Sequence, residues 1–226
     1  MGETATRCGG EGVVKADEGF EGGAVGNSRE GLRGSSAQTV AVLAVQGAFI
    51  EHERRFERLG CRCIELRQAR DLERPFDRLV LPGGESTVQA KLLRELGMLE
   101  ALRECIEAGM PVLGTCAGLI LLAKRVEGVG VFESNGFGTL PVTVRRNAYG
   151  RQLGSFHASA RFAGIKRVPM TFIRAPLVAE VGEGVEVLAR VEGDIVAVRY
   201  ENQLGVAFHP ELDCDDQVLQ MFLEMS

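Results

Sequence analysis

The sequence lacks several features that would assign it to a specialised class of protein. It has no apolar run near the roughly 18 residues that a membrane-spanning helix needs. It also lacks an excess of positive charge, because 26 Lys and Arg face 31 Asp and Glu for a formal net charge of −5. Nucleic acids and anionic membranes do not attract such a chain. We therefore predict a soluble protein with no nucleic-acid or membrane partner.

The chain has only three histidines, and its six cysteines have no repeated spacing. This pattern indicates neither a disulfide framework nor the paired ligands of a zinc site. Cys61 and Cys63 lie close together, but alternating positions on a strand explain them better than metal ligation does. We expect no metal, no cofactor and a reducing, cytoplasmic location.

Residues 1–38 differ in composition from the rest of the chain. They are rich in Gly, Ser and charged residues, and they contain few large apolar side chains. Such a segment cannot bury enough apolar surface to offset its ordering entropy, so we predict a disordered extension. It also lacks the apolar core of a secretory signal. The remaining residues, 39–226, are long enough for one sizeable α/β domain.

Short apolar runs alternate with amphipathic segments from Thr39 onward. Nearly continuous apolar strands of this kind are typical of a parallel sheet with helices on both faces. Later runs alternate in polarity and are separated by Gly, Asn and Pro, which predicts an antiparallel extension that includes GVAFHPE. The predicted strands are 39–47, 61–67, 76–86 and 110–116, and the predicted helices are 48–60, 87–97, 99–109 and 215–225.

Cys116 lies in PVLGTCAGLILLAK, between a predicted strand and a predicted helix. Gly114 and Gly118 flank it, and small residues permit the sharp turn of a nucleophile elbow. A helix N-terminus favours the thiolate form of a cysteine. The amide of Ala117 can then donate to an oxyanion. A buried structural cysteine is the alternative, and the motif favours catalysis.

A thiolate nucleophile needs a base, which one of the three histidines must provide. His52 lies among charges on a predicted helix, where we expect a solvated side chain, and His157 lies in an exposed-looking strand or loop. His209 directly follows an apolar strand in GVAFHPELD, and Pro210 stiffens the turn after it. Glu211 can orient the imidazole, the third role in a triad. We predict His209 as the base.

The segment LPGGEST follows another predicted strand and begins a helix, with Ser86 or Thr87 as the expected N-cap. It has no dinucleotide or P-loop pattern, which argues against a nucleotide site. In a parallel sheet it should line the crevice at the carboxyl ends of the strands. The amides of Gly83 and Gly84 can then complete an oxyanion hole opposite Cys116.

Several motifs together resemble one known family, the glutaminase subunits of pyridoxal 5′-phosphate synthase. These subunits are class I, triad-type glutamine amidotransferases, and the resemblance runs from about Val40 to Met225. It implies a three-layer, flavodoxin-like α/β fold with a mostly parallel sheet. In chain order the motifs are LPGGEST, GTCAGLILLAK, RRNAYGRQ, FIRAP and FHPEL.

The resemblance implies that Cys116 attacks the carboxamide of L-glutamine, with His209 and Glu211 completing the triad. It also implies a partner, a (β/α)₈-barrel synthase subunit that uses the released ammonia to make pyridoxal 5′-phosphate. Residues 46 and 47, Gln and Gly in VQGAFIEH, match a segment near that interface and are expected to sense docking. The implied glutamine contacts are Gly84, Glu85, Ser86, Arg146, Ile173 and Arg174.

Two other functions are compatible with the residues. A cysteine-elbow hydrolase of another ester or lactone would use the same triad without turning over glutamine. A non-catalytic subunit that binds the synthase would carry a vestigial triad, although all three triad positions hold functional residue types.

Overall fold

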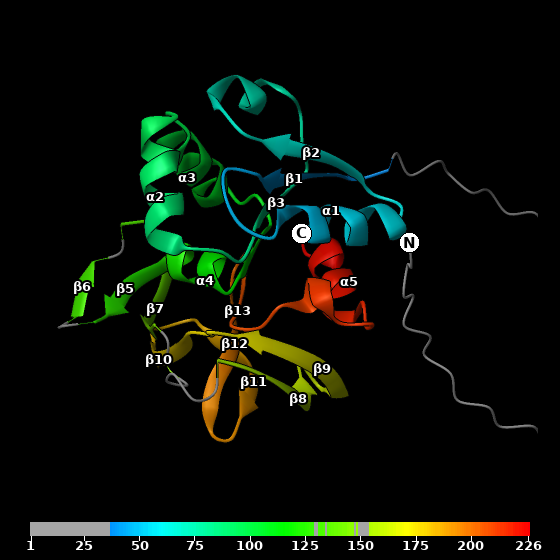
Figure 1. The fold of residues 1–226 in the computed structure, drawn as a ribbon, viewed down its shortest axis with the longest axis vertical. Coiled ribbons are helices and arrows are strands. Elements are labelled where there is room, and N and C mark those ends of the chain that lie inside the picture. Colours follow the sequence, from blue (N-terminus) through cyan, green and yellow to red (C-terminus); the bar gives the residue numbers. More distant parts are fainter. Residues whose placement is uncertain (1–36, 129–130, 134, 147, 149–153) are drawn as a thin grey trace, which may run out of the picture. The chain divides into compact units, whose positions relative to one another are not determined.

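The apolar runs form the central strands of a mixed sheet (Figure 1). The computed structural model describes residues 37–226 except 129–130, 134, 147 and 149–153. The predicted extension, 1–38, therefore lies outside the described residues apart from its last two positions. Everything below concerns the unit that begins at Ser36.

Five neighbouring strands of the sheet are parallel. Their order is β2 (Arg62–Leu66), β1 (Thr39–Leu43), β3 (Arg78–Leu81), β4 (Val112–Thr115) and β13 (Gln203–Val206). Most of their residues are buried, as expected for strands covered on both faces. The segment before His209 was predicted to belong to the antiparallel extension, but its strand β13 pairs in parallel with β4. Only the other edge of β13 is antiparallel, where it pairs with β12 (Asp194–Tyr200).

An antiparallel region continues the sheet beyond β12. It contains β10 (Leu177–Val181), β7 (Leu140–Arg145), β5 (Ala123–Glu127) and β6 (Val131–Glu133), with β5 and β7 parallel to each other. A branch adds β11 (Glu186–Val191), β8 (Ser155–Phe162) and β9 (Ile165–Ile173). Two-residue turns with positive φ at both positions close the β8–β9 and β11–β12 hairpins, the geometry that matches strand twist.

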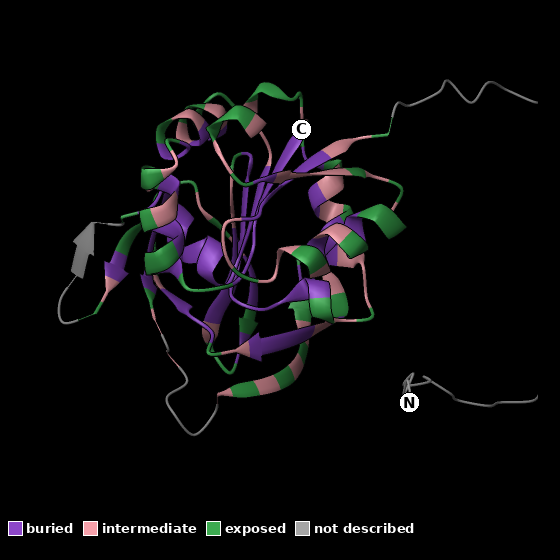
Figure 2. Cartoon of the chain, turned by 45° about the horizontal axis from the view of Figure 1, so that its top comes forward, coloured by how far each residue is buried: buried purple, intermediate pink, exposed green. Residues whose placement is uncertain are grey.

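Helices cover both faces of the parallel strands (Figures 1 and 2). One side carries α1 (Phe49–Arg58) and α5 (Gln217–Glu224), where Phe56 packs edge-on against Phe222 at 5.8 Å between ring centroids. The other side carries α2 (Ser86–Glu95), α3 (Leu99–Glu107) and α4 (Ala117–Leu122). Two 3₁₀ helices, η1 (Ala69–Glu73) and η2 (Pro210–Leu212), complete the described elements. The predicted α/β class is confirmed.

No helix within the described part of the chain is long and apolar enough to cross a membrane. The longest helices, α1 and α2, have ten residues each. Each is amphipathic, and its apolar side packs on the sheet.

Candidate active site

Cys116 occupies a strained turn between β4 and α4. Its φ of 49° and ψ of −98° lie outside the regions that non-glycine residues favour, as expected for a nucleophile elbow. The flanking glycines are sterically required. A Cβ atom on Gly118 would lie 2.0 Å from the carbonyl oxygen of Leu81, and one on Gly114 would lie 2.7 Å from the Gly118 backbone. The predicted elbow is therefore present.

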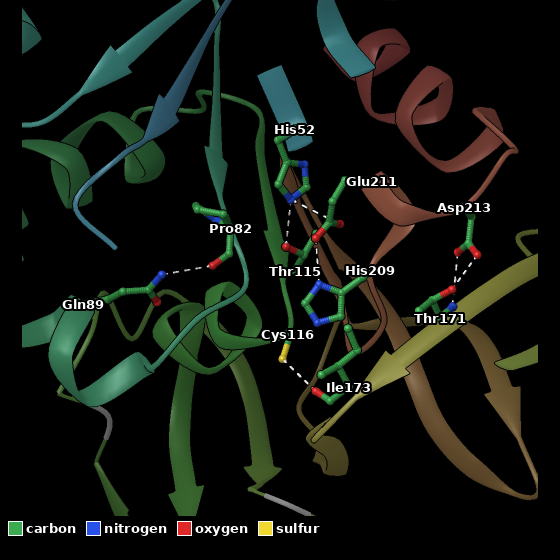
Figure 3. A network of polar contacts seen from close by, with 10 residues as sticks. All are labelled: His52, Pro82, Gln89, Thr115, Cys116, Thr171, Ile173, His209, Glu211 and Asp213. Atoms are coloured by element: carbon green, nitrogen blue, oxygen red, sulfur yellow. Dashed lines mark hydrogen bonds and ion pairs between the residues drawn. The ribbon is translucent and has the colours of Figure 1, made fainter. Parts of the chain in front are cut away.

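His209 reaches Cys116 because β13 lies beside β4 in parallel. The carboxyl ends of the two strands coincide, and each strand is followed by one of these residues. His209 is buried, and its backbone N–H donates to the carbonyl of Thr171 at 2.8 Å. Figure 3 shows the imidazole ring between the Cys116 sulfur and the Glu211 carboxylate. The tertiary structure thus brings all three predicted triad residues together.

Glu211 holds the far side of the histidine ring. Its Oε1 lies 2.7 Å from His209 Nδ1. Burial alone would lower the pKa of His209, but hydrogen bonds with Cys116 and Glu211 outweigh burial and raise this pKa to about 10. Burial alone would raise the pKa of Glu211, yet the neighbouring His52 and the hydrogen bond with His209 lower it. The arrangement favours an ionised carboxylate and a basic imidazole.

The loop after β3 lies beside the triad. A Cβ atom on Gly83 would come within 2.4 Å of His209 Cε1, so only glycine fits there. The Gly83 carbonyl accepts a hydrogen bond from the Ala48 N–H at 3.0 Å. Because C=O and N–H of a trans peptide point in opposite directions, the Gly84 N–H points away from Ala48.

Glu85, and not Ser86 or Thr87, is the N-cap of α2. Its carboxylate accepts hydrogen bonds from the backbone N–H groups of Thr87 and Val88, at 3.4 and 3.1 Å. A carboxylate is stabilised at a helix N-terminus by the same orphan N–H groups that serine would cap. The expected N-cap was therefore wrong by one residue, and Ser86 is instead buried against the cavity.

Gln46 and Gly47 contact this loop rather than the cavity. The Gln46 side-chain Oε1 accepts a hydrogen bond from the Glu85 N–H at 2.8 Å. Gly47 has a φ of 105°, and a Cβ atom there would lie 1.9 Å from the Gly83 carbonyl oxygen. The segment after β1 therefore supports the loop that carries the predicted oxyanion amides.

A cavity of about 250 Å³ opens at the elbow. Nine of the predicted site residues line it, and Ile120 is the additional lining residue. This volume suits a ligand smaller than a drug-sized molecule. The predicted residues in its wall are Gly84, Glu85, Ser86, Cys116, Ala117, Arg146, Ile173, Arg174 and His209.

Arg146 is held at the cavity by α2. Its Nη1 donates to Thr87 Oγ1 at 3.1 Å, across 59 positions of sequence. Its Nε is buried and has no hydrogen-bond partner among the described residues. Arg174, also in the wall, has a positive φ of 45°. Two guanidinium groups at one small cavity favour a ligand with a carboxylate.

In the wall of the same cavity, the Cys116 thiol faces the Ile173 carbonyl oxygen at 3.9 Å (Figure 3). No group of three or more His, Cys, Asp or Glu side chains within the described ranges is arranged to hold a metal ion.

His52 was wrongly predicted to be solvated. Its side chain is fully buried and lies against Glu211 and Thr115. The signal was in the helical spacing, because His52 lies three residues after Phe49 and four before Phe56, on the apolar stripe of α1. Of the charged neighbours in EHERR, Glu51, Glu53 and Arg54 lie on other faces, whereas Arg55 is buried on the same side as His52. Ile120 could have been found in the same way, since it follows Cys116 by four residues on α4.

The sequence signature of the SNO glutamine amidotransferase family matches residues 42–226. The chain belongs to this family. The "Pyridoxal 5'-phosphate synthase subunit PdxT" of Desulfitobacterium hafniense strain Y51 is 60% identical over 185 residues, which cover 82% of this chain and 92% of that protein. The protein of the same name from Methanocorpusculum labreanum is 58% identical over 186 residues, 82% of this chain and 96% of the relative.

Solved structures agree with the family assignment. A crystal structure described as a glutamine amidotransferase superposes with a TM-score of 0.77 at 44% identity, covering 82% of this chain and 97% of that one. PurLQS from Thermotoga maritima has a TM-score of 0.60 at 15% identity, which shows a shared fold alone. The chain is thus an enzyme of the glutamine amidotransferase class, with the class I fold that the sequence predicted.

Proposed function

We propose that this chain hydrolyses L-glutamine to L-glutamate and ammonia, with Cys116, His209 and Glu211 as a catalytic triad. The observation that carries the proposal is the strained elbow of Cys116 in a small cavity shared with His209, Arg146 and Arg174. Membership of a glutamine amidotransferase family supports the choice of substrate. The alternative hydrolase would not need two arginines at the cavity.

Glutamine binding follows from the lining of the cavity. Its α-carboxylate pairs with Arg146 and Arg174, and Glu85 and the backbone carbonyl of Ile173 are available to its α-ammonium group. Gly84, Ser86 and Ile120 lie against the rest of the molecule. This places the carboxamide carbon at the sulfur of Cys116.

In the first half of the reaction, the sulfur of Cys116 attacks the carboxamide carbon while its proton is held on Nε2 of His209, as the raised pKa of that ring favours. The backbone N–H groups of Gly84 and Ala117 stabilise the resulting oxyanion. The Gly84 N–H belongs to the peptide bond between Gly83 and Gly84. The C–N bond then breaks, and His209 returns the proton to the departing ammonia. Glu211 stabilises the imidazolium throughout.

In the second half, water attacks the glutamyl thioester. His209 takes a proton from the water, the C–S bond breaks, and the sulfur is protonated again as L-glutamate leaves. The raised pKa of His209 fits a ring that holds the proton of Cys116 beside the reacting sulfur.

The ammonia is delivered to a pyridoxal 5′-phosphate synthase subunit with a (β/α)₈ barrel, in the cytoplasm. The names of the similar PdxT proteins support this partner, and the free thiols of all described cysteines fit a reducing compartment. Nucleic acids and membranes have no part in this proposal.

Gln46 and Gly47 sense the docked synthase in this proposal. They support the Gly83–Glu85 loop, so a partner that moves them moves the oxyanion amides. Ile50 and Val88 are 45% and 42% exposed on the first turns of α1 and α2, the helices that follow these two segments.

The test is glutamate release from L-glutamine, measured with and without the cognate synthase subunit. We expect release that rises sharply when the partner is added. Strong release that does not change when the partner is added would support the glutaminase activity and overturn the proposed docking. No release in either case, with intact binding to the synthase, would identify a vestigial triad, whereas turnover of an ester substrate would favour the alternative hydrolase.

A further inference from the structure

A second buried histidine lies behind the triad. His52, on the second turn of α1, is 0% exposed. Its Nε2 lies 3.3 Å from Glu211 Oε2 and 3.1 Å from Thr115 Oγ1. Because the other oxygen of Glu211 contacts His209, one carboxylate is flanked by two histidine rings (Figure 3).

The surroundings of His52 decide which ring nitrogen carries the proton. Its Nδ1 is buried with no hydrogen-bond partner among the described residues. A proton on Nδ1 would leave a buried donor unpaired and would turn the lone pair of Nε2 toward the Glu211 carboxylate. A proton on Nε2 instead faces Glu211 Oε2 and Thr115 Oγ1. The favoured form is the Nε2–H tautomer.

Charge supports the same arrangement. Burial is the largest influence on His52 and lowers its pKa, although Glu211 and, more weakly, Glu51 raise it and His209 lowers it further. The lowered pKa of His52 favours its neutral form at neutral pH. A neutral N–H stabilises the carboxylate without competing with the imidazolium of His209 for its negative charge.

We propose that His52 is a positioning residue of the triad, one that holds the Glu211 carboxylate in place and keeps it ionised for His209. The proposal rests on the proposed function, because the triad must operate for its positioning to affect turnover. It extends the Cys116–His209–Glu211 chain by one residue on a different element of the fold. His52 does not line the cavity, so it acts on the triad from behind, through its contact with Glu211.

α1 is well suited to this role because it is fixed to the segment that follows Glu211. Arg55, one turn beyond His52, is buried and donates to the backbone carbonyls of Asp213 and Asp215. Its guanidinium also pairs with the Asp216 carboxylate at 2.5 Å. These contacts hold the helix and the 211–216 segment together, so the distance between His52 and Glu211 does not depend on a flexible loop.

Two substitutions separate positioning from packing. His52→Leu removes the N–H and keeps an apolar side chain of similar bulk. His52→Gln places an amide N–H near the position of the histidine Nε2 and so provides a conservative rescue. Both should be made in the full chain and assayed with the cognate synthase subunit, with thermal melting as a control for folding.

We expect His52→Leu to lower kcat for glutamate release by about ten- to a hundred-fold, because the contact between the Nε2–H and the Glu211 carboxylate is lost. KM for glutamine should stay unchanged, and His52→Gln should recover most of kcat. Unchanged kcat in His52→Leu would overturn the proposal. If both variants lost kcat equally and also melted at equally lowered temperatures, His52 would be a packing residue. That result would overturn the proposal too.

A second readout does not require glutamine turnover. The rate of Cys116 alkylation by iodoacetamide, followed on the Cys116 peptide by mass spectrometry, reports how well the His209–Glu211 pair supports the thiolate. The titratable groups facing His52 are Glu211, His209 and Glu51. His52→Leu should shift the alkylation profile to higher pH, and His52→Gln should restore it. An unshifted profile would overturn the positioning role, even if the wild-type chain proved inactive on glutamine.

Discussion

His209 Nδ1 lies 2.7 Å from Glu211 Oε1, although only Pro210 separates the two residues in the chain. The proline and the 3₁₀ turn of η2 fold the glutamate back onto the ring of the residue two positions before it. Nδ1 of His209 therefore donates to Glu211, which leaves Nε2 for the sulfur of Cys116. This assignment makes the triad directly testable.

Replacing His209 by Asn should lower kcat for glutamate release by about 10²- to 10⁴-fold, because general acid–base help is lost. This kcat is measured by fixed-time assays of glutamate release with the synthase subunit present. His157→Asn is the matched control, because His157 is exposed and contacts Thr171 rather than the triad. A near-wild-type rate for His209→Asn would transfer the role of base to another histidine.

The raised pKa of His209 predicts a pH dependence of stability. A folded-state pKa of about 10 against a reference of 6.5 means that the ionised ring adds stability fully below about pH 6.5 and loses this contribution as pH rises toward 10. The difference in unfolding free energy between the wild type and His209→Gln should therefore shrink between pH 6.5 and 10. Urea unfolding across this range measures it, and a difference that is constant or grows would contradict the assignment.

Cys116 should be needed for chemistry and costly for folding. Cys116→Ala should bind glutamine and the synthase but release no glutamate, as measured by calorimetry and a glutamate assay. Cys116→Gly should be equally inactive and about 1 kcal/mol more stable than Cys116→Ala, because glycine adopts positive φ with little strain. Any sustained turnover by either variant would exclude Cys116 as the nucleophile.

Gly83→Ala should displace His209 without unfolding the chain. The new methyl group would meet the imidazole at 2.4 Å, and the ring is held by Glu211 and cannot simply rotate away. Misplacing a catalytic group by about 1 Å can cost about a hundred-fold in rate, so we expect a loss of that size in kcat. Gly154→Ala is the control, since nothing lies within 4 Å of its added methyl and its φ is not positive. Equal activity of the two variants would argue against a tight fit at Gly83.

Thr87 should tune substrate binding through Arg146. Thr87→Val removes the hydroxyl that accepts from the guanidinium while preserving shape, and the net value of such a bond predicts a rise in KM for glutamine of about three- to tenfold. kcat should change little, because Thr87 is remote from the reacting atoms. Thr87→Ser retains the acceptor and should retain KM. A loss confined to kcat would show that Thr87 acts on the chemistry.

The local sequence was sufficient to predict the elements and the reactive groups. The features that predicted the reactive groups are local, because each depends on the sterics or charge of neighbouring residues. They are the glycines around Cys116, the apolar run before His209 and the Pro-Glu pair after it. The α/β class followed in the same way, since alternation of buried strands and amphipathic helices is a local property. The family resemblance added the substrate contacts, which no local pattern distinguishes from surface residues.

Longer-range relationships required the folded chain. β13 pairs with β4 although they lie about 90 residues apart, and this parallel pairing is what brings His209 to Cys116. The burial of His52 depends on Glu211 and Thr115 meeting it from two other elements. Its own neighbours in the chain are charged, and they indicated solvent. Hydrogen bonds between distant segments depend on the packing of the whole domain. For that reason the triad residues could be predicted one by one, while the contact between His52 and Glu211 could not.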